Sequence, residues 1–237
     1  MTNPDGSGRE AEQPAGIACL LFDIDGTLIS TGGASDRAWH RAFLELQGVD
    51  VNVPDYTGKG MPDPAVGLAC FRGAIGREPR PEEMEALMDL RQRHLEEEVA
   101  TSPGYRVMPG AVETLKRLTE AGRLVGLITG NTVPAARAKL GRAGLNDYFA
   151  FGGFGSDASE RVDVCRIALD RAEAAAGGDF DRAGSIATGD TPRDVEAAHG
   201  AGIRVVGVAT GDYSVEQLGD AGADWVVASL ADGPLPF

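Results

Sequence analysis

The chain has 237 residues, 43 % of them hydrophobic, which suffices for one large domain or two modest ones around a packed core. Its formal net charge of −14 argues against nucleic-acid and membrane-surface partners, because polyanions would be repelled, while local cations could still hold a small anionic substrate. Three widely spaced cysteines give neither a metal-ligand spacing nor a disulfide framework, which indicates a reducing, cytoplasmic setting.

Residues 1–15 are polar and rich in Gly and Pro, and we expect them to form a mobile N-terminal segment. They lack the basic and apolar regions of a signal peptide, and no stretch reaches the length of a membrane-spanning helix. We therefore expect a cytoplasmic protein without a membrane partner, as a monomer or a homodimer.

The first apolar run ends in the sequence LLFDIDGTL over residues 20–28, which places Asp23 and Asp25 directly after a strand. A near-continuous apolar run is typical of a buried parallel strand, and open α/β sheets bind ligands outside the carboxyl ends of such strands. Two close carboxylates repel each other and lose hydration on burial, so a divalent cation would stabilise them. The pair therefore predicts a magnesium-type site.

Residues 33–105 show helical patterns at 35–47, 64–75 and 82–100, so we expect an all-helical cap inserted into the core. Glycine and proline flank the block on both sides, which favours a hinge. Within it, Lys59 lies in a Gly-flanked loop that lacks the spacing of a P-loop. We expect Lys59 to contact substrate; the alternative is an exposed loop lysine.

From residue 106 onward, short apolar runs alternate with helical patterns, which predicts βαβ crossovers and the α/β fold class. Residues 16–32 and 106–237 would form a Rossmann-like core with a parallel sheet, and the glycine-rich stretch 151–155 would be a loop. We expect helices at 111–121, 133–143, 162–176 and 195–200, and strands at 124–129, 149–152, 185–188, 203–208 and 225–228.

Three later segments also carry polar residues at strand ends or helix starts. They are Thr129, Gly130 and Asn131 in ITGN, Arg161 in SERVD, and Asp190 and Asp194 in GDTPRD. Because the carboxyl ends of parallel strands share one edge of a sheet, these segments and the first aspartate pair can converge on one crevice.

The motifs resemble those of the haloacid dehalogenase superfamily of phosphohydrolases, with the phosphoglycolate-phosphatase-like branch and its small helical cap most similar. Asp-x-Asp-Gly-Thr behind an apolar run and Gly-Asp-x-x-x-Asp after a later strand are the specific motifs. At the third motif, where most members carry a lysine, this chain has Arg161, and the planar fork of an arginine differs from the point charge of a lysine.

The resemblance implies a phosphatase that acts on a small phosphorylated metabolite with Mg²⁺ as its cofactor. Asp23 would attack phosphorus, and Asp25 would protonate the leaving oxygen and then activate water, with burial and the neighbouring acid keeping Asp25 protonated. The implied metal-site residues are Asp23, Asp25 through its backbone carbonyl, Asp190 and Asp194. The implied phosphate- and substrate-binding residues are Thr129, Gly130, Asn131, Arg161 and Lys59.

Other interpretations stay open at this point. A phosphomutase on a sugar phosphate, or a non-catalytic phosphate-binding protein, fits the same fold, whereas a dehalogenase would have no use for Asp25 or Asp190. Asp194 together with Thr191 also forms a helix capping box, and Asn131 or Thr132 has the alternative role of a plain helix cap. Arg161 has the alternative of a surface arginine.

Overall fold

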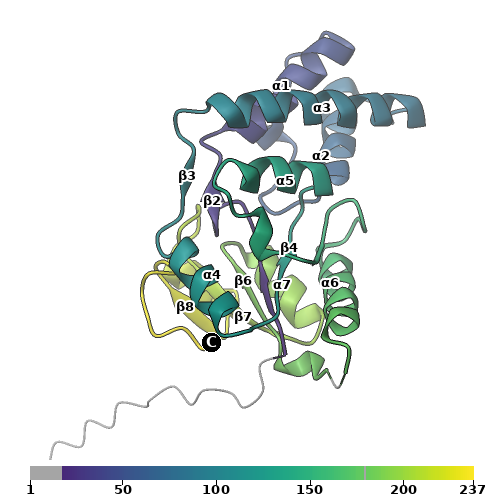
Figure 1. The fold of residues 1–237 in the computed structure, drawn as a ribbon. Coiled ribbons are helices and arrows are strands. Elements are labelled where there is room, and N and C mark those ends of the chain that lie inside the picture. The colour runs from purple at the N-terminus through teal and green to yellow at the C-terminus, as the bar shows by residue number, and fades with distance from the viewer. Residues whose placement is uncertain (1–17, 179) are drawn as a thin grey trace, which may run out of the picture.

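The structure is a computed structural model that describes residues 18–178 and 180–237, so the segment 1–15 lies outside the described residues. Within the described part, six parallel strands form one sheet in the order β5-β4-β1-β6-β7-β8 (Figure 1), which confirms the α/β class. The strands are β1 Leu20–Phe22, β4 Val125–Ile128, β5 Gly152–Gly153, β6 Ile186–Gly189, β7 Arg204–Val208 and β8 Trp225–Val227. Strand β1 lies between β4 and β6, so its end occupies the middle of the carboxyl edge.

Helices cover both faces of this sheet. They are α4 Ala111–Glu120, α5 Val133–Gly141, α6 Arg161–Ala176, α7 Pro192–Gly200 and the short α8 Val215–Asp220. Leu20 and Phe22 of β1 pack with α4 and α5 on one face, and Leu21 packs with α6 and α7 on the other, because successive side chains of a strand point to opposite faces. Burial of both faces explains the near-continuous apolar runs of the sequence.

A block of helices, here named the helical insertion (residues 34–101), stands next to α5 on the side away from the sheet (Figure 1). Its helices are α1 Ala34–Gln47, α2 Asp63–Cys70, the π-helical turn Phe71–Ile75 and α3 Pro81–Thr101. Trp39, Phe43 and Leu87 belong to a hydrophobic core of its own. A separate cluster joins α1 and α3 to Ala135 of α5, so α5 is packed between the insertion and the sheet.

Two chain crossings that lie side by side connect the insertion to the sheet. Strand β2 (Ile29–Ser30) pairs antiparallel with β3 (Arg106–Val107). Just beyond this pair, a Cβ built on Gly32, whose φ is 61°, would lie 2.3 Å from the carbonyl carbon of Gly104. Only glycine allows so close an approach of two backbones at a positive φ. The glycines that favoured a hinge therefore bring the two crossings together.

The structure differs from the predicted elements mainly where they are short. The strand expected at 149–152 begins only at Gly152, and the stretch 151–155, expected to be a loop, contains β5. Strands β2 and β3 and helix α8 have 2, 2 and 6 residues, too few for a periodic pattern to show. Short 3₁₀ turns occur at Val53–Asp55, Asn146–Tyr148 and Arg182–Gly184. Among the described helices, none is long and apolar enough to cross a membrane.

Candidate active site

The polar segments predicted from the sequence meet at the carboxyl edge of the sheet. A cavity of about 530 Å³ lies there, lined by residues of the core and of the helical insertion. The predicted site residues that line it are Asp23, Asp25, Lys59, Thr129, Gly130, Asn131, Arg161 and Asp190. Asp194 lies next to them through its contact with Arg161. The structure thus brings all the predicted residues to one region.

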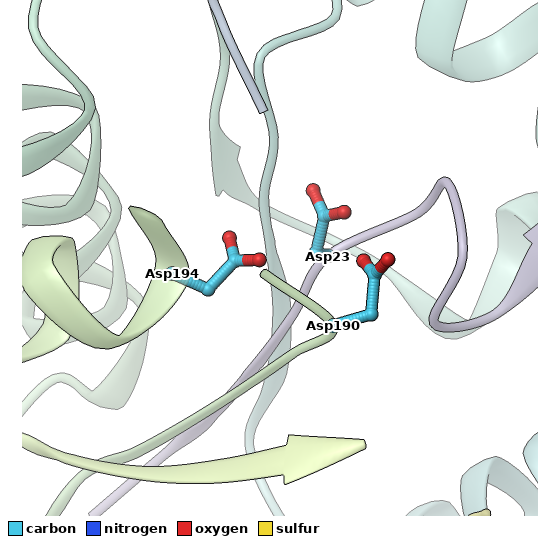
Figure 2. A group of neighbouring side chains, drawn as sticks. All are labelled: Asp23, Asp190 and Asp194. Carbon is cyan, nitrogen blue, oxygen red and sulfur yellow. The ribbon is translucent and has the colours of Figure 1, made fainter. Parts of the chain in front are cut away.

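Three buried carboxylates form the acidic centre of this region. Asp23, Asp190 and Asp194 each offer an oxygen within 4.8 Å of the others (Figure 2). Burial above all raises the pKa of Asp23 and of Asp190, and the charge of Asp194 adds to both shifts. Such a cluster is a suitable site for a divalent metal, because a dication removes the repulsion between the acids.

The turn after β1 is shaped to hold these acids together. The backbone N–H of Asp23 donates to the carbonyl of Thr188 at 2.9 Å, so Asp23 continues the register of β1. Gly26 follows with a φ of 85°, and a Cβ at this position would lie 2.2 Å from Oδ2 of Asp190. A glycine is therefore required for the turn and for the approach of Asp190.

Arg161 is a fixed cation at the start of α6. Its Nη2 donates to Oδ1 of Asp23 and to Oδ1 of Asp194, at 2.6 Å each. Burial works to lower the pKa of Arg161, but the two carboxylates more than offset it and raise that pKa. With 7 % of its surface exposed, Arg161 is not a surface arginine, and that alternative is wrong.

Asp194 performs the capping role and contacts the site at the same time. Its Oδ2 accepts from the backbone N–H of Thr191 at 3.0 Å, while the Thr191 hydroxyl accepts from the backbone N–H of Asp194 at 3.3 Å. This reciprocal capping box starts α7 at Pro192. The other carboxylate oxygen of Asp194, Oδ1, accepts a hydrogen bond from Nη2 of Arg161. The capping box therefore fixes the position of the Asp194 carboxylate, which in turn orients Arg161.

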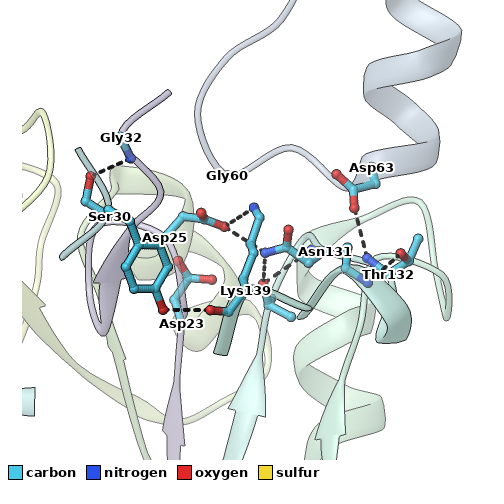
Figure 3. A network of polar contacts seen from close by, with 12 residues as sticks. Asp23, Asp25, Ser30, Gly32, Gly60, Asp63, Asn131, Thr132 and Lys139 are labelled. Atoms are coloured by element: carbon cyan, nitrogen blue, oxygen red, sulfur yellow. Dashed lines mark hydrogen bonds and ion pairs between the residues drawn. The ribbon is translucent and has the colours of Figure 1, made fainter. Parts of the chain in front are cut away.

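The side chain of Asp25 points toward Lys139 (Figure 3). Nζ of Lys139 donates to its Oδ2 at 2.7 Å, and Nδ2 of Asn131 donates to the same oxygen at 2.8 Å. Burial works to raise the pKa of Asp25, but Lys139 and Asn131 outweigh it and hold that pKa below its ordinary value. The expectation that burial and a neighbouring acid keep Asp25 protonated is therefore wrong for this arrangement.

The loop between β4 and α5 is held by hydrogen bonds within itself and by one from the helical insertion. The hydroxyl of Thr129 accepts from the backbone N–H of Asn131 at 3.2 Å and from its Nδ2 at 2.8 Å. Thr132 caps α5 with its side chain, so the capping role falls to Thr132 and leaves the amide of Asn131 for Asp25. Opposite, Oδ2 of Asp63 in the insertion accepts from the backbone N–H of Thr132 at 3.0 Å (Figure 3).

Several residues of the site were not predicted from the sequence. They are Asp63, Arg91 and Lys139. One feature of the sequence could have identified Lys139 as buried. It lies on the same face of α5 as the apolar residues Ala135, Ala136 and Leu140. Lys59 lies at the cavity but is largely exposed, with Nζ 3.3 Å from Asp212, so its contact with substrate stays a prediction.

Comparisons with known proteins agree with this geometry. Residues 17–202 match the family described as haloacid dehalogenase-like hydrolase. A phosphoglycolate phosphatase from Agrobacterium fabrum is 31 % identical over 202 residues, which cover 84 % of this chain and 83 % of that protein.

Solved structures show the same fold. A predicted phosphoglycolate phosphatase from Haemophilus somnus has a TM-score of 0.72 at 19 % identity and covers 91 % of this chain and 96 % of its own. A β-phosphoglucomutase from Clostridium difficile has a TM-score of 0.72 at 18 % identity, with 91 % and 92 % covered. The chain therefore belongs to the haloacid dehalogenase-like hydrolase family and is a phosphoric monoester hydrolase, as its motifs predicted.

Proposed function

We propose that this chain is a magnesium-dependent phosphatase that hydrolyses a small, phosphoglycolate-like phosphate monoester through an aspartyl-phosphate on Asp23. The observation that carries the proposal is Asp23 itself, a buried carboxylate that lines the cavity and has one oxygen bound by Arg161. The name of the relative from Agrobacterium fabrum supports the substrate class. The cavity of about 530 Å³ is of a size that suits a small ligand.

The residues present fit a divalent cation. Among the described residues, Asp190 has one hydrogen-bond donor, the hydroxyl of Thr27 at 3.3 Å, so its carboxylate retains free acceptor positions beside Asp23. Mg²⁺ prefers such oxygen ligands, and we assign it to the carboxylates of Asp23 and Asp190 and the backbone carbonyl of Asp25, with Asp194 in support. When bound, it would supply positive charge against the phosphoryl oxygens.

Asp23 would attack phosphorus with its carboxylate oxygen as the bond to the leaving alcohol breaks, and Asp25 would give the alcohol its proton. Water would then attack the phosphorus of the aspartyl-phosphate, Asp25 would take its proton, and phosphate would leave. Against the effect of burial, Lys139 and Asn131 lower the pKa of Asp25, which favours the carboxylate that the second step needs, so Asp25 would have to acquire a proton before the first step.

The phosphoryl group would be held by a cation and by the loop after β4. Arg161 can neutralise its charge, since its guanidinium already lies on Asp23 at 2.6 Å. The hydroxyl of Thr129 and the backbone amides of Gly130 and Asn131 lie just before Thr132, the N-cap of α5, and backbone N–H groups near a helix N-terminus favour anions. Residues 33–105 would act as a cap that excludes water from the reaction.

Phosphate release tests this proposal directly. Phosphoglycolate, sugar phosphates and nucleoside monophosphates are offered with Mg²⁺ and with EDTA, and release is expected for a small ester and only with the metal. Asp23→Asn should keep the far-UV circular dichroism spectrum and lose turnover, because the amide is a poor nucleophile. Full activity of that variant would contradict the covalent route. Rearrangement of a sugar phosphate without free phosphate would identify a mutase instead.

A further inference from the structure

Lys139 is a buried lysine outside the four polar segments that define the site. Its side chain is 3 % exposed, and a buried ammonium destabilises a fold unless a partner of opposite charge is present. Its partner is Oδ2 of Asp25, at 2.7 Å across 114 positions of sequence (Figure 3). Lys139 is thus a buried cation that lines the cavity in addition to Arg91 and Arg161.

The position of this ammonium is set by the packing of α5. Ala136 and Leu140 of the helix belong to the core of the sheet, and Ala135 packs against the helical insertion. The hydroxyl of Tyr105 donates to the backbone carbonyl of Lys139 at 2.7 Å. Because α5 is packed on both sides, the position of the Lys139 side chain relative to Asp25 is restricted.

The two carboxylate oxygens of Asp25 differ in their hydrogen-bond partners. Lys139 and Asn131 both bind Oδ2, whereas among the described residues no donor reaches Oδ1. The side chain keeps 39 % of its surface exposed, and Asp25 lines the cavity. One oxygen is therefore held by the protein while the other is available to substrate.

We propose that Lys139 is a positioning residue that holds Asp25 by Oδ2, so that Oδ1 meets the leaving oxygen and then the attacking water. This inference rests on the proposed function of Asp25 as acid and base. An ammonium suits the task because it is a compact donor, and Asn131 supplies the second direction that fixes the plane of the carboxylate.

The test is a double-mutant cycle on Lys139 and Asp25, with kcat and KM measured on an alkyl phosphate. Lys139→Met should lower kcat by about 10²-fold with little change of KM, since a placed general acid contributes about 10²–10⁴-fold. In an Asp25→Asn background, Lys139→Met should cause almost no further loss, because its effect passes through Asp25. Lys116→Met, on the exposed side of α4, is the matched control and should keep the kcat of the unmodified enzyme.

A second substrate and a second variant separate positioning from a loss of structure. With p-nitrophenyl phosphate, whose leaving group needs little protonation, Lys139→Met should lower the rate of the first step much less. Lys139→Arg keeps the buried charge and should regain part of kcat. Unchanged kcat in Lys139→Met, or additive losses in the cycle, would overturn the inference. No phosphate release by the unmodified enzyme would refute the proposed function, and this inference with it.

Discussion

The guanidinium of Arg161 joins Asp23, which follows strand β1, to Asp194 in the first turn of helix α7. One nitrogen, Nη2, contacts both Asp23 and Asp194, so the carboxylates share a single donor group. The sequence indicated a cation at this place but could not decide between a buried and an exposed arginine, since that depends on where the start of α6 lies against β1. At this position the arginine both balances buried acids and remains beside the proposed nucleophile.

Removing this cation should affect catalysis and stability together. We expect Arg161→Met to lower kcat by about 10²–10³-fold, as for the loss of a group that stabilises transition-state charge. The free energy of unfolding should fall by about 3–5 kcal/mol, because two buried carboxylates lose their partner. Steady-state kinetics and urea unfolding measure the two effects.

A neighbour on the same helix provides the control. Arg166 forms an exposed ion pair with Asp163 at 2.8 Å, and Arg166→Met should change stability by less than about 0.5 kcal/mol. Arg161→Lys keeps the charge and should lie between the unmodified enzyme and Arg161→Met. A fully active Arg161→Met would show that the guanidinium is not needed for the phosphoryl group.

At the level of helices and strands, the long elements were predictable and the contacts between them were not. Apolar runs such as Leu20–Phe22 and helical patterns that end at glycine identify the parallel sheet, since burial on both faces leaves a strong pattern. Motifs at the strand ends identify most of the site. By contrast, Lys139 and Asp63 take part through the packing of α5 against the helical insertion, and that packing is not encoded in any local spacing.

Asp63 connects two elements that belong to different parts of the molecule. Its Oδ1 accepts from Nη2 of Arg91 in α3 at 3.0 Å, and its Oδ2 binds the first turn of α5 through Thr132. Asp63→Ala should lower the free energy of unfolding by about 3–5 kcal/mol, because Arg91 is buried and would lose its charge partner. KM should rise as the start of α5 loses this restraint. Urea unfolding and steady-state kinetics measure both effects.

The paired variant distinguishes a lost ion pair from a general disturbance. In Asp63→Ala combined with Arg91→Met, no buried charge is left alone, and part of the lost stability should return. If the double variant were as unstable as the sum of both single variants, the ion pair would not be the cause.

At the scale of the whole molecule, the acidic character of the chain extends into the site. The formal net charge is −14, and acids gather even inside the sheet edge at Asp23, Asp190 and Asp194. Burial raises the pKa of Asp23 and Asp190 above the ordinary value of 3.8, so the native state binds more protons than the unfolded chain once the pH exceeds that value. Without metal, stability should therefore fall as the pH rises from about 4 toward alkaline values.

Divalent metal should reverse this trend. We expect Mg²⁺ to raise Tm more at about pH 8 than at about pH 5, because protons compete with the cation for the same oxygens. Thermal unfolding with EDTA and with Mg²⁺ at both pH values measures the difference. Asp190→Asn removes one of the acids and should weaken both the pH dependence and the response to Mg²⁺. An equal rise of Tm at both pH values would argue against these carboxylates as ligands.

The chain connects the helical insertion to the sheet at the side-by-side crossings β2 and β3. Besides the packing of α1 and α3 on α5, the insertion contacts the loop before α5: the backbone N–H of Asp63 donates to the carbonyl of Gly130 at 2.7 Å, and the Asp63 carboxylate accepts from the backbone N–H of Thr132. Under the proposed function, the loop that would hold the phosphoryl group is therefore tied to the helical insertion, and any displacement of the insertion from the core would alter that loop as well.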